Sequence, residues 1–328
     1  MAIIEVNRVC KDFHVHTRRP GILSSVKSLF WREYEVKKAV QDISFQIAQG
    51  ELVGYIGPNG AGKSTTVKML SGILVPTSGS ILVDGRTPHL NRQENARHMG
   101  VVFGQRSQLY WDLPMVETFD LYRKMYRIDE PRFRENVAFY VDLLDMQEFL
   151  HRPVRQLSLG QKMRANLAVA LLHDPKIVYL DEPTIGLDVV GKSRIRRFLR
   201  EVNEQKKTTV ILTTHDMDDI EEICNRIIMI HEGRILFDGL LADFKRKFSK
   251  GHMLTVECAQ ADVSVPDPRL RVIRDQDGRA SILFQPNEIT VVEAVTCVMQ
   301  HNRVLDLGIR EPEIEEIIRE FYEDMKQV

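Results

Sequence analysis

The sequence has few cysteines and no long apolar run. Its four cysteines, Cys10, Cys224, Cys258 and Cys297, are widely spaced and form no Cys-x-x-Cys pair. This pattern favours reduced thiols in a cytosolic protein over a disulfide framework or a zinc site. No apolar run approaches the ~18–20 residues that a helix needs to cross a bilayer. The first residues also lack a secretory signal pattern, so we expect a chain that neither spans a membrane nor is secreted.

The chain also has no excess of charge of one sign. Its 45 basic and 46 acidic residues nearly cancel, so no global basic field attracts nucleic acid, and no nucleic-acid partner is expected. At 328 residues the chain is long enough for one large core and a smaller appended domain.

A glycine-rich loop ending in Lys-Ser lies between an apolar run at residues 52–56, which predicts a buried strand, and a helical pattern at residues 66–71. The loop comprises Gly57, Pro58, Asn59, Gly60, Ala61, Gly62, Lys63 and Ser64, with Thr65 behind it. In this context the glycines let successive N–H groups point inward as an anion-binding nest. Lys63 can then reach the β- and γ-phosphates, and the Ser64 hydroxyl can ligate Mg²⁺. The sequence therefore predicts a nucleoside triphosphate site.

Two acids end a second apolar run, at residues 177–180. A buried strand that ends in Asp181-Glu182 places one carboxylate toward Mg²⁺ and the other beside the γ-phosphate. Asp181 is predicted to hold the metal, and Glu182 to act as the general base that polarises the attacking water. A third apolar strand, residues 210–214, ends in His215, which is able to contact the γ-phosphate and orient the water.

A second candidate anion site is the predicted start of a helix at residues 162–173. Ser158, Gly160 and Gln161 there offer a hydroxyl and free backbone N–H groups to a phosphate. The segment resembles the signature motif of ATP-binding-cassette (ABC) ATPases, in which two copies pair head to tail around two ATP molecules. The family usually has glycine where this chain has Leu159.

Further landmarks of the family occur in the expected order. Gln105 resembles the Q-loop glutamine, which senses Mg²⁺ and relays to the membrane subunit. Asp188 matches the D-loop residue that crosses the dimer interface. Phe13 matches the aromatic residue that stacks on adenine, with Tyr34 as a weaker candidate. The resemblance covers roughly residues 1–240.

The resemblance and the spacing of the motifs imply an α/β fold. A P-loop (RecA-like) core sheet with an antiparallel β portion and a helical signature subdomain, about residues 106–165, should occupy residues 1–245. A small C-terminal α/β domain should occupy residues 246–328 and could regulate, dimerise or only stabilise the chain. Residues about 14–38 form an N-terminal insertion, and their basic amphipathic pattern fits either contact with a membrane or permease or an ordinary surface helix.

The resemblance implies an ATPase that uses ATP and Mg²⁺ to power transport. The pattern is most similar to ATP-binding subunits of ABC-2 type exporters, in particular the viologen or drug exporter branch. It implies a homodimer of this chain docked on one or two ABC-2 type permease subunits at the cytoplasmic face of the cell membrane. The alternative is a soluble ABC ATPase acting on ribosomes or DNA, but the chain has one phosphate loop and lacks inserted coiled coils or zinc-binding cysteines.

Overall fold

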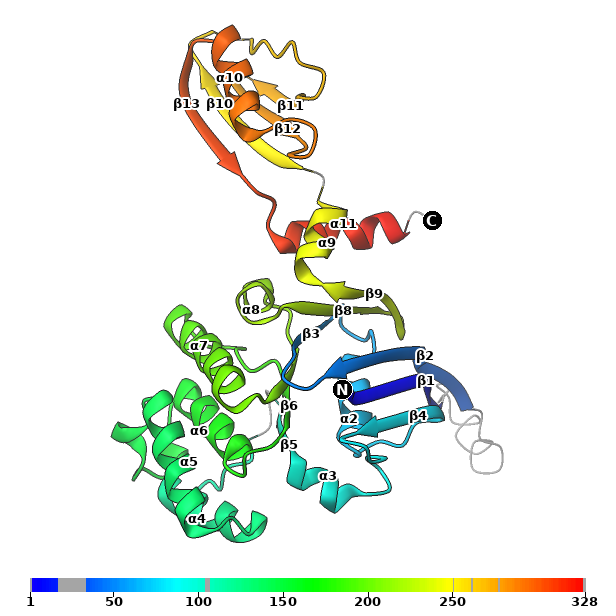
Figure 1. Ribbon diagram of the computed structural model, residues 1–328, viewed down its shortest axis with the longest axis vertical. Helices are drawn as coiled ribbons and strands as arrows, with labels where there is room; N and C mark the ends of the chain where they lie inside the picture. The colour runs from blue at the N-terminus through cyan, green and yellow to red at the C-terminus, as the bar shows by residue number, and fades with distance from the viewer. Residues whose placement is uncertain are drawn as a thin grey trace, which may run out of the picture. The chain divides into compact units, whose positions relative to one another are not determined.

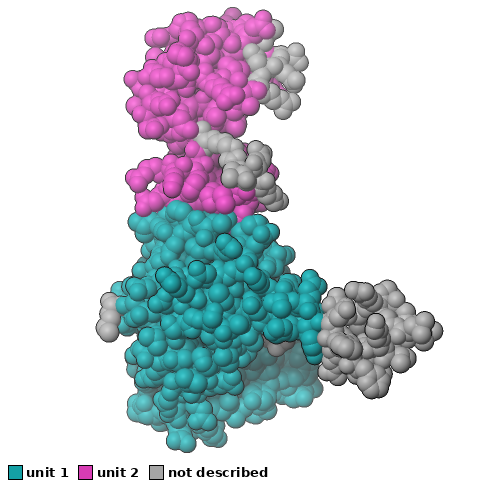
Figure 2. All heavy atoms as spheres, turned by 90° about the vertical axis from the view of Figure 1, so that its right-hand side faces the viewer, with its two compact units in different colours: residues 1–241 teal, residues 242–328 magenta. Residues whose placement is uncertain are grey.

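The computed structural model describes residues 2–16, 34–103, 107–249, 251–260, 262–276 and 278–326. The chain divides into two units, Met1–Leu241 and Ala242–Val328, which Figure 2 colours teal and magenta. The predicted α/β fold is confirmed, since both units combine β-sheets with helices (Figure 1).

The central sheet of the first unit has six strands in the order β5-β6-β7-β3-β8-β9. Its strands are β3 (Leu52–Ile56), β5 (Met99–Phe103), β6 (Ile177–Asp181), β7 (Thr209–Thr213), β8 (Arg226–His231) and β9 (Arg234–Leu240). All neighbours pair in parallel except β8 and β9. Every residue of β3 and β7 is buried, as expected for parallel strands covered on both faces. The carboxyl ends of β3, β6 and β7 therefore meet at one edge of the sheet.

A smaller antiparallel sheet has the order β2-β1-β4 and forms the predicted antiparallel portion. It consists of β1 (Ala2–His16), β2 (Tyr34–Ala48) and β4 (Ser78–Val83). The β1–β2 ribbon is paired from Ala2↔Ala48 to His16↔Tyr34, so both ends of the expected insertion at residues 14–38 belong to strands. The helix expected within the insertion falls on residues 17–33, outside the described part of the chain.

The helices of the first unit are α2 (Lys63–Leu70), α3 (Arg92–His98), α4 (Met115–Tyr126), α5 (Glu130–Leu143), α6 (Leu159–Leu171), α7 (Val189–Lys206) and α8 (Met217–Ile223), with 3₁₀ turns η1 (Gln147–Phe149) and η2 (Val154–Gln156). Helix α6 contacts α4, α5 and strand β5, and these helices lie to one side of the sheet in Figure 1. The capping box of Ser158 and Gln161 begins α6, because the two side chains satisfy each other's backbone N–H groups.

The core of the first unit lies between the two sheets. Tyr55 and Val53 of β3, Tyr179 of β6 and the inward residues of β1 and β2 form one buried cluster with Val67 of α2. Burial of these side chains fixes β3 and β6, and hence the loops that follow them, with respect to each other.

The second unit has a four-stranded antiparallel sheet in the order β11-β12-β10-β13. Its elements are α9 (Leu241–Phe248), β10 (His252–Cys258), β11 (Arg271–Gln276), β12 (Arg279–Phe284), α10 (Val291–His301), β13 (Val304–Arg310) and α11 (Ile314–Lys326). Leu254, Ile282 and Phe284 of the sheet form a separate core with Val298 of α10. Among the described helices of both units, none combines the length and the apolar character that a membrane crossing requires.

Candidate nucleotide site

A cleft of about 650 Å³ lies at the carboxyl edge of the central sheet. It is lined by residues of the glycine-rich loop, the end of β6 and the β1–β2 ribbon: Phe13, His14, Val15, Lys37, Ala39, Asn59, Gly60, Gly62, Lys63, Ser64, Thr65, Asp181 and Glu182. The structure therefore brings the loop and the acid pair, more than 100 residues apart in the sequence, into one cavity.

The glycine-rich loop needs its glycines for two different reasons. Gly62 is the N-cap of α2 with a φ of 110°, and Gly60 has a φ of 83°, values that other residues rarely adopt. Gly57 has no such φ, but a Cβ there would lie 2.1 Å from the carbonyl oxygen of Ile230 in β8. The loop can therefore turn and pack against β8 only with glycine at these positions.

Lys63 is bound within the loop. Its Nζ donates to the carbonyl oxygens of Gly57 at 2.6 Å and Pro58 at 3.1 Å. Burial lowers the pKa of Lys63 from its ordinary value, and the carboxylates of Glu182 and Asp181 oppose this shift. Lys63 and the N-terminus of α2 give the cleft a positive end suited to a phosphate.

Asp181 lies opposite the start of α2. Its Oδ2 accepts a hydrogen bond from the Ser64 hydroxyl at 3.4 Å, and its Oδ1 accepts one from the Thr213 hydroxyl at 2.5 Å. A hydroxyl and a carboxylate side by side are hard oxygen ligands of the kind that Mg²⁺ takes together with phosphates and water. The residues present therefore fit the predicted Mg²⁺ site.

Glu182 and His215 face each other at the ends of adjacent strands. His215 Nδ1 lies 3.2 Å from Glu182 Oε1, and the histidine side chain is 66% exposed whereas Glu182 is 27% exposed. Glu182 has a left-handed backbone with a φ of 54°, and its N–H donates to the Thr213 carbonyl at 2.8 Å. Glu182 lines the cleft, whereas His215 is not among its lining residues. A carboxylate beside an imidazole can accept a proton from water.

Of the two aromatic residues predicted to stack on adenine, Phe13 lines the cleft and Tyr34 is not among its lining residues. Phe13 is half-buried, and the Lys11 ammonium lies 5.3 Å from its ring centroid. Tyr34 lies at the end of the ribbon, where it makes an edge contact with His14.

The signature residues lie outside the residues that line the cleft. Ser158 accepts a hydrogen bond from the Gln161 N–H at 3.2 Å, and the Gln161 Oε1 accepts one from the Ser158 N–H at 2.9 Å. Gly160 follows in the first turn of α6. Leu159 is 53% exposed, and its side chain lies beside Gly186.

Asp188 is exposed and caps α7, where its Oδ1 accepts from the Gly191 N–H at 2.8 Å. The predicted Q-loop residue Gln105 lies outside the described residues. The sequence interpretation did not include Lys37, which reaches the cleft because β2 pairs Lys37 with Phe13 of β1. Only the register of the ribbon reveals this neighbour, and no local motif marks it.

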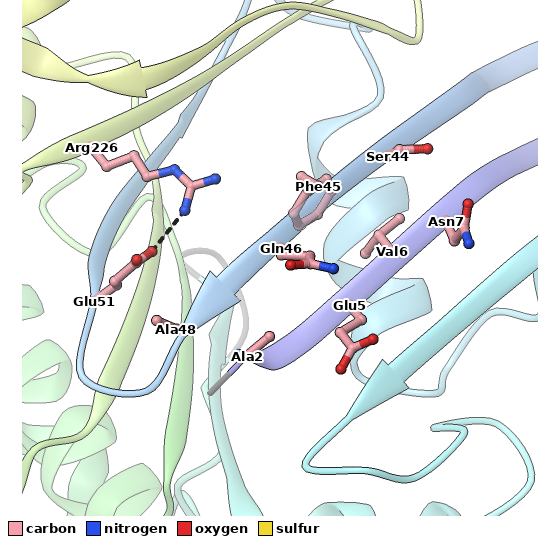
Figure 3. A pocket seen from close by; sticks show the side chains of 10 residues that line it. All are labelled: Ala2, Glu5, Val6, Asn7, Ser44, Phe45, Gln46, Ala48, Glu51 and Arg226. Atoms are coloured by element: carbon pink, nitrogen blue, oxygen red, sulfur yellow. Dashed lines mark hydrogen bonds and ion pairs between the residues drawn. The ribbon is translucent and has the colours of Figure 1, made fainter.

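A second pocket, of about 700 Å³, opens on the antiparallel sheet and includes Glu5, Gln46 and Glu51 (Figure 3). Its Arg226 points toward Glu51, at 2.9 Å, and also pairs with Asp238 at 2.7 Å. Because two carboxylates neutralise this guanidinium, the pocket does not present an open anion site like that of the cleft.

Comparisons with known proteins identify the family of the chain. Residues 40–185 match the family model described as ABC transporter. The chain is 32% identical over 219 residues to the ABC transporter ATP-binding protein NatA of Bacillus subtilis, which covers 67% of this chain and 89% of NatA. It is 32% identical over 245 residues to the probable multidrug ABC transporter ATP-binding protein YbhF of Escherichia coli, covering 74% of this chain but only 40% of YbhF.

Among solved structures, the dimeric post-hydrolysis state of the ATP-binding cassette MJ0796 bound to ADP and Pi is similar, with a TM-score of 0.60 and 26% identity. The match covers 73% of this chain and 98% of that one. The chain therefore belongs to the family of ABC transporter ATP-binding proteins, and it is an ATP-binding ABC ATPase.

Proposed function

We propose that this chain is the ATP-hydrolysing subunit of an exporter whose membrane-spanning permeases are separate chains. The observation that supports hydrolysis by this chain is the pair Glu182 and His215, whose side chains lie 3.2 Å apart. Of the two, Glu182 lines the same cleft as Lys63. Two facts support the separate permeases. The family model is described as ABC transporter, and the match to NatA, a relative named as an ATP-binding protein, covers 89% of that relative.

In the proposed reaction, Glu182 accepts a proton from a water molecule as the water oxygen attacks the γ-phosphorus. The bond from the γ-phosphorus to the bridging oxygen breaks, and ADP leaves with that electron pair. His215 orients the water and the γ-phosphate, and Lys63 binds the β- and γ-phosphate oxygens. Mg²⁺ would be held by Ser64 and Asp181, and the family pattern implies Gln105 as a further ligand. The metal would neutralise phosphate charge.

We place adenine on Phe13, because this aromatic ring lines the same cleft as the phosphate loop. Stacking of a base on an aromatic side chain contributes roughly 1–3 kcal/mol. The ring lies at the ribbon end of the cleft, and Lys63 with Ser64 would take the phosphates at the other end.

The active form would be a head-to-tail homodimer. Ser158, Gly160, Gln161 and Asp188 do not line the cleft of their own chain, and Ser158 and Asp188 lie at exposed helix starts. In the dimer each set would complete the cleft of the other chain. ATP would then favour the closed dimer because it contacts both chains there, and hydrolysis would remove these contacts and reopen it.

The dimer would dock on one or two permeases of the ABC-2 type at the cytoplasmic face of the membrane. Export is the direction that the resemblance to ABC-2 type exporters implies, and the name of the similar protein YbhF describes a probable multidrug transporter. Affinity purification from detergent-solubilised membranes tests this part, and stoichiometric multi-span proteins are expected to co-purify. Recovery with ribosomal or DNA-repair proteins alone would contradict it.

The test of the enzymatic part is Glu182→Gln. This variant should still bind ATP and should accumulate as a dimer in size-exclusion chromatography, while kcat falls by roughly 10²-fold or more because the general base is gone. Glu204→Gln, at an exposed position of α7, is the matched control and should hydrolyse ATP like the wild type. Wild-type turnover in Glu182→Gln would show that another group is the base.

A further inference from the structure

A buried carboxylate connects the two loops that carry Glu182 and His215. Asp219 of α8 is fully buried, and its Oδ2 accepts hydrogen bonds from two threonine hydroxyls. Thr184 donates at 2.5 Å and Thr214 at 3.1 Å. Thr184 follows Glu182 by two residues, and Thr214 immediately precedes His215. One carboxylate oxygen thus joins the end of the β6 loop to the end of β7.

The other oxygen of Asp219 is held by an arginine from a third element. Asp219 Oδ1 accepts from Arg196 Nε at 2.6 Å, and Arg196 is only 6% exposed. The same guanidinium donates to Glu222 at 2.6 Å and to Asp216 at 3.3 Å. Arg196 belongs to α7, the helix that Asp188 caps. The buried charge of Asp219 is therefore paired and hydrogen-bonded on both oxygens, and its position is set by three elements.

The two active loops need such support. Glu182 adopts a left-handed backbone, which for a residue other than glycine costs about 1–2 kcal/mol and persists only where the surroundings enforce it. Its own N–H is bonded to Thr213, on one side of the residue. On the C-terminal side of Glu182, the hydrogen bond from the Thr184 hydroxyl to Asp219 ties the loop to α8.

We infer that Asp219 is a positioning residue for ATP hydrolysis, which through Thr184 and Thr214 fixes Glu182 with respect to His215. The inference rests on the proposed roles of those two residues. Neither threonine lines the cleft, so the two hydroxyls act on turnover through the placement of their neighbours and not through contact with the nucleotide. Removal of the hydroxyls should therefore lower kcat and leave ATP binding almost unchanged.

The experiment replaces both hydroxyls with methyl groups of equal size in Thr184→Val/Thr214→Val. We expect kcat to fall about 10- to 100-fold, since displacement of a reacting group by about 1 Å costs on that order, while the Kd for ATP changes less than about threefold. Thr184→Ser/Thr214→Ser keeps both hydroxyls and should restore kcat to within about threefold of the wild type. Thr118→Val is the matched control, because Thr118 is equally buried but its hydroxyl bonds the carbonyl of Pro114, the N-cap of α4.

The melting temperature of each variant separates positioning from stability. If Thr184→Val/Thr214→Val has a lower melting temperature than the wild type but the same kcat, Asp219 only stabilises the fold and the inference is wrong. If the double variant does not fold, the same comparison is made with Thr214→Val and Thr214→Ser. An inactive Glu182→Gln beside a fully active valine variant would refute this inference alone, whereas an active Glu182→Gln would refute the proposed base.

Discussion

A methyl group at Gly57 should destabilise the nucleotide core by direct collision. The ideal Cβ would lie 2.1 Å from the carbonyl oxygen of Ile230, well inside van der Waals contact, and 3.2 Å from the carbonyl carbon. Both atoms belong to the backbone of β8, which pairs with β3, so neither can rotate away as a side-chain atom would. The loop must then shift or the two strands must separate locally.

Gly57→Ala is expected to lower the free energy of unfolding by about 3 kcal/mol, the upper part of the usual range for overpacking. For a unit of this size that corresponds to a fall in melting temperature of ~6–12 °C. The same shift moves the N–H groups of the loop, so affinity for ATP should fall as well. Thermal unfolding and titration with a fluorescent ATP analogue measure the two effects.

Gly85→Ala is the matched control for this prediction. Gly85 has a φ of 73°, and a Cβ there would meet no atom within 4 Å, so alanine brings only backbone strain. That strain costs about 1 kcal/mol, a fall of ~2–4 °C, and it should leave ATP affinity unchanged. The reasoning is refuted if Gly57→Ala melts no lower than Gly85→Ala.

Two further predictions concern the stacking of adenine on Phe13 and the pH dependence of stability. Phe13→Ala should raise the Kd for ATP by about 10-fold, and Phe13→Tyr should restore it, because base stacking contributes roughly 1–3 kcal/mol; equal affinities of the two variants would remove Phe13 from the site. Burial lowers the pKa of His173 to about 4, and the ring stacks on Tyr126 with centroids 3.9 Å apart. In the unfolded chain the histidine pKa is about 6.5, so the unfolded state binds the proton first as the pH falls. The contribution of neutral His173 to the free energy of unfolding is therefore fully present above pH ~6.5 and is lost as the pH drops toward 4. At pH 5 the loss in the free energy of unfolding should reach about 2 kcal/mol. Urea unfolding at pH 7 and pH 5 measures it, and the His173→Gln variant should lose less stability between these pH values than the wild type. An equal loss in both proteins would contradict the assignment to His173.

The phosphate loop and the strand–helix order of the core could be predicted because each depends on local sequence. The glycines before Lys63 predict the loop, and the apolar runs before Asp181 and His215 predict buried strands, from patterns that span only a few residues. The cleft residue Lys37 could not be predicted, because it depends on the pairing register of a ribbon whose strands are joined through residues 17–33. Such a register is set by long-range packing.

The hydrogen-bond network around the buried Asp219 also could not be predicted from the sequence. Asp218 and Asp219 are adjacent acids at the start of one short helix, yet the side chain of Asp218 is 78% exposed and that of Asp219 is fully buried. Helical periodicity alone assigns neither acid to the interior, since charged residues are normally placed at the surface. Arg196 of α7 pairs with both acids, but the Thr184 and Thr214 hydroxyls bond Asp219 alone, and these partners come from other parts of the chain.

The backbone of Glu182 explains how two neighbouring acids serve one cleft. In a continued strand, Asp181 and Glu182 would point to opposite faces of the sheet. The strand ends at Asp181, and the left-handed φ of 54° at Glu182 breaks the alternation, so both carboxylates line the same cavity. Asp181 then faces Ser64 and Glu182 faces His215, which would separate the proposed metal-binding oxygen from the proposed proton-accepting one. The left-handed backbone of Glu182 is held by the hydrogen bond from its N–H to the Thr213 carbonyl and by that from Thr184 to Asp219. This local structure is therefore what would allow two neighbouring acids to take the two proposed roles.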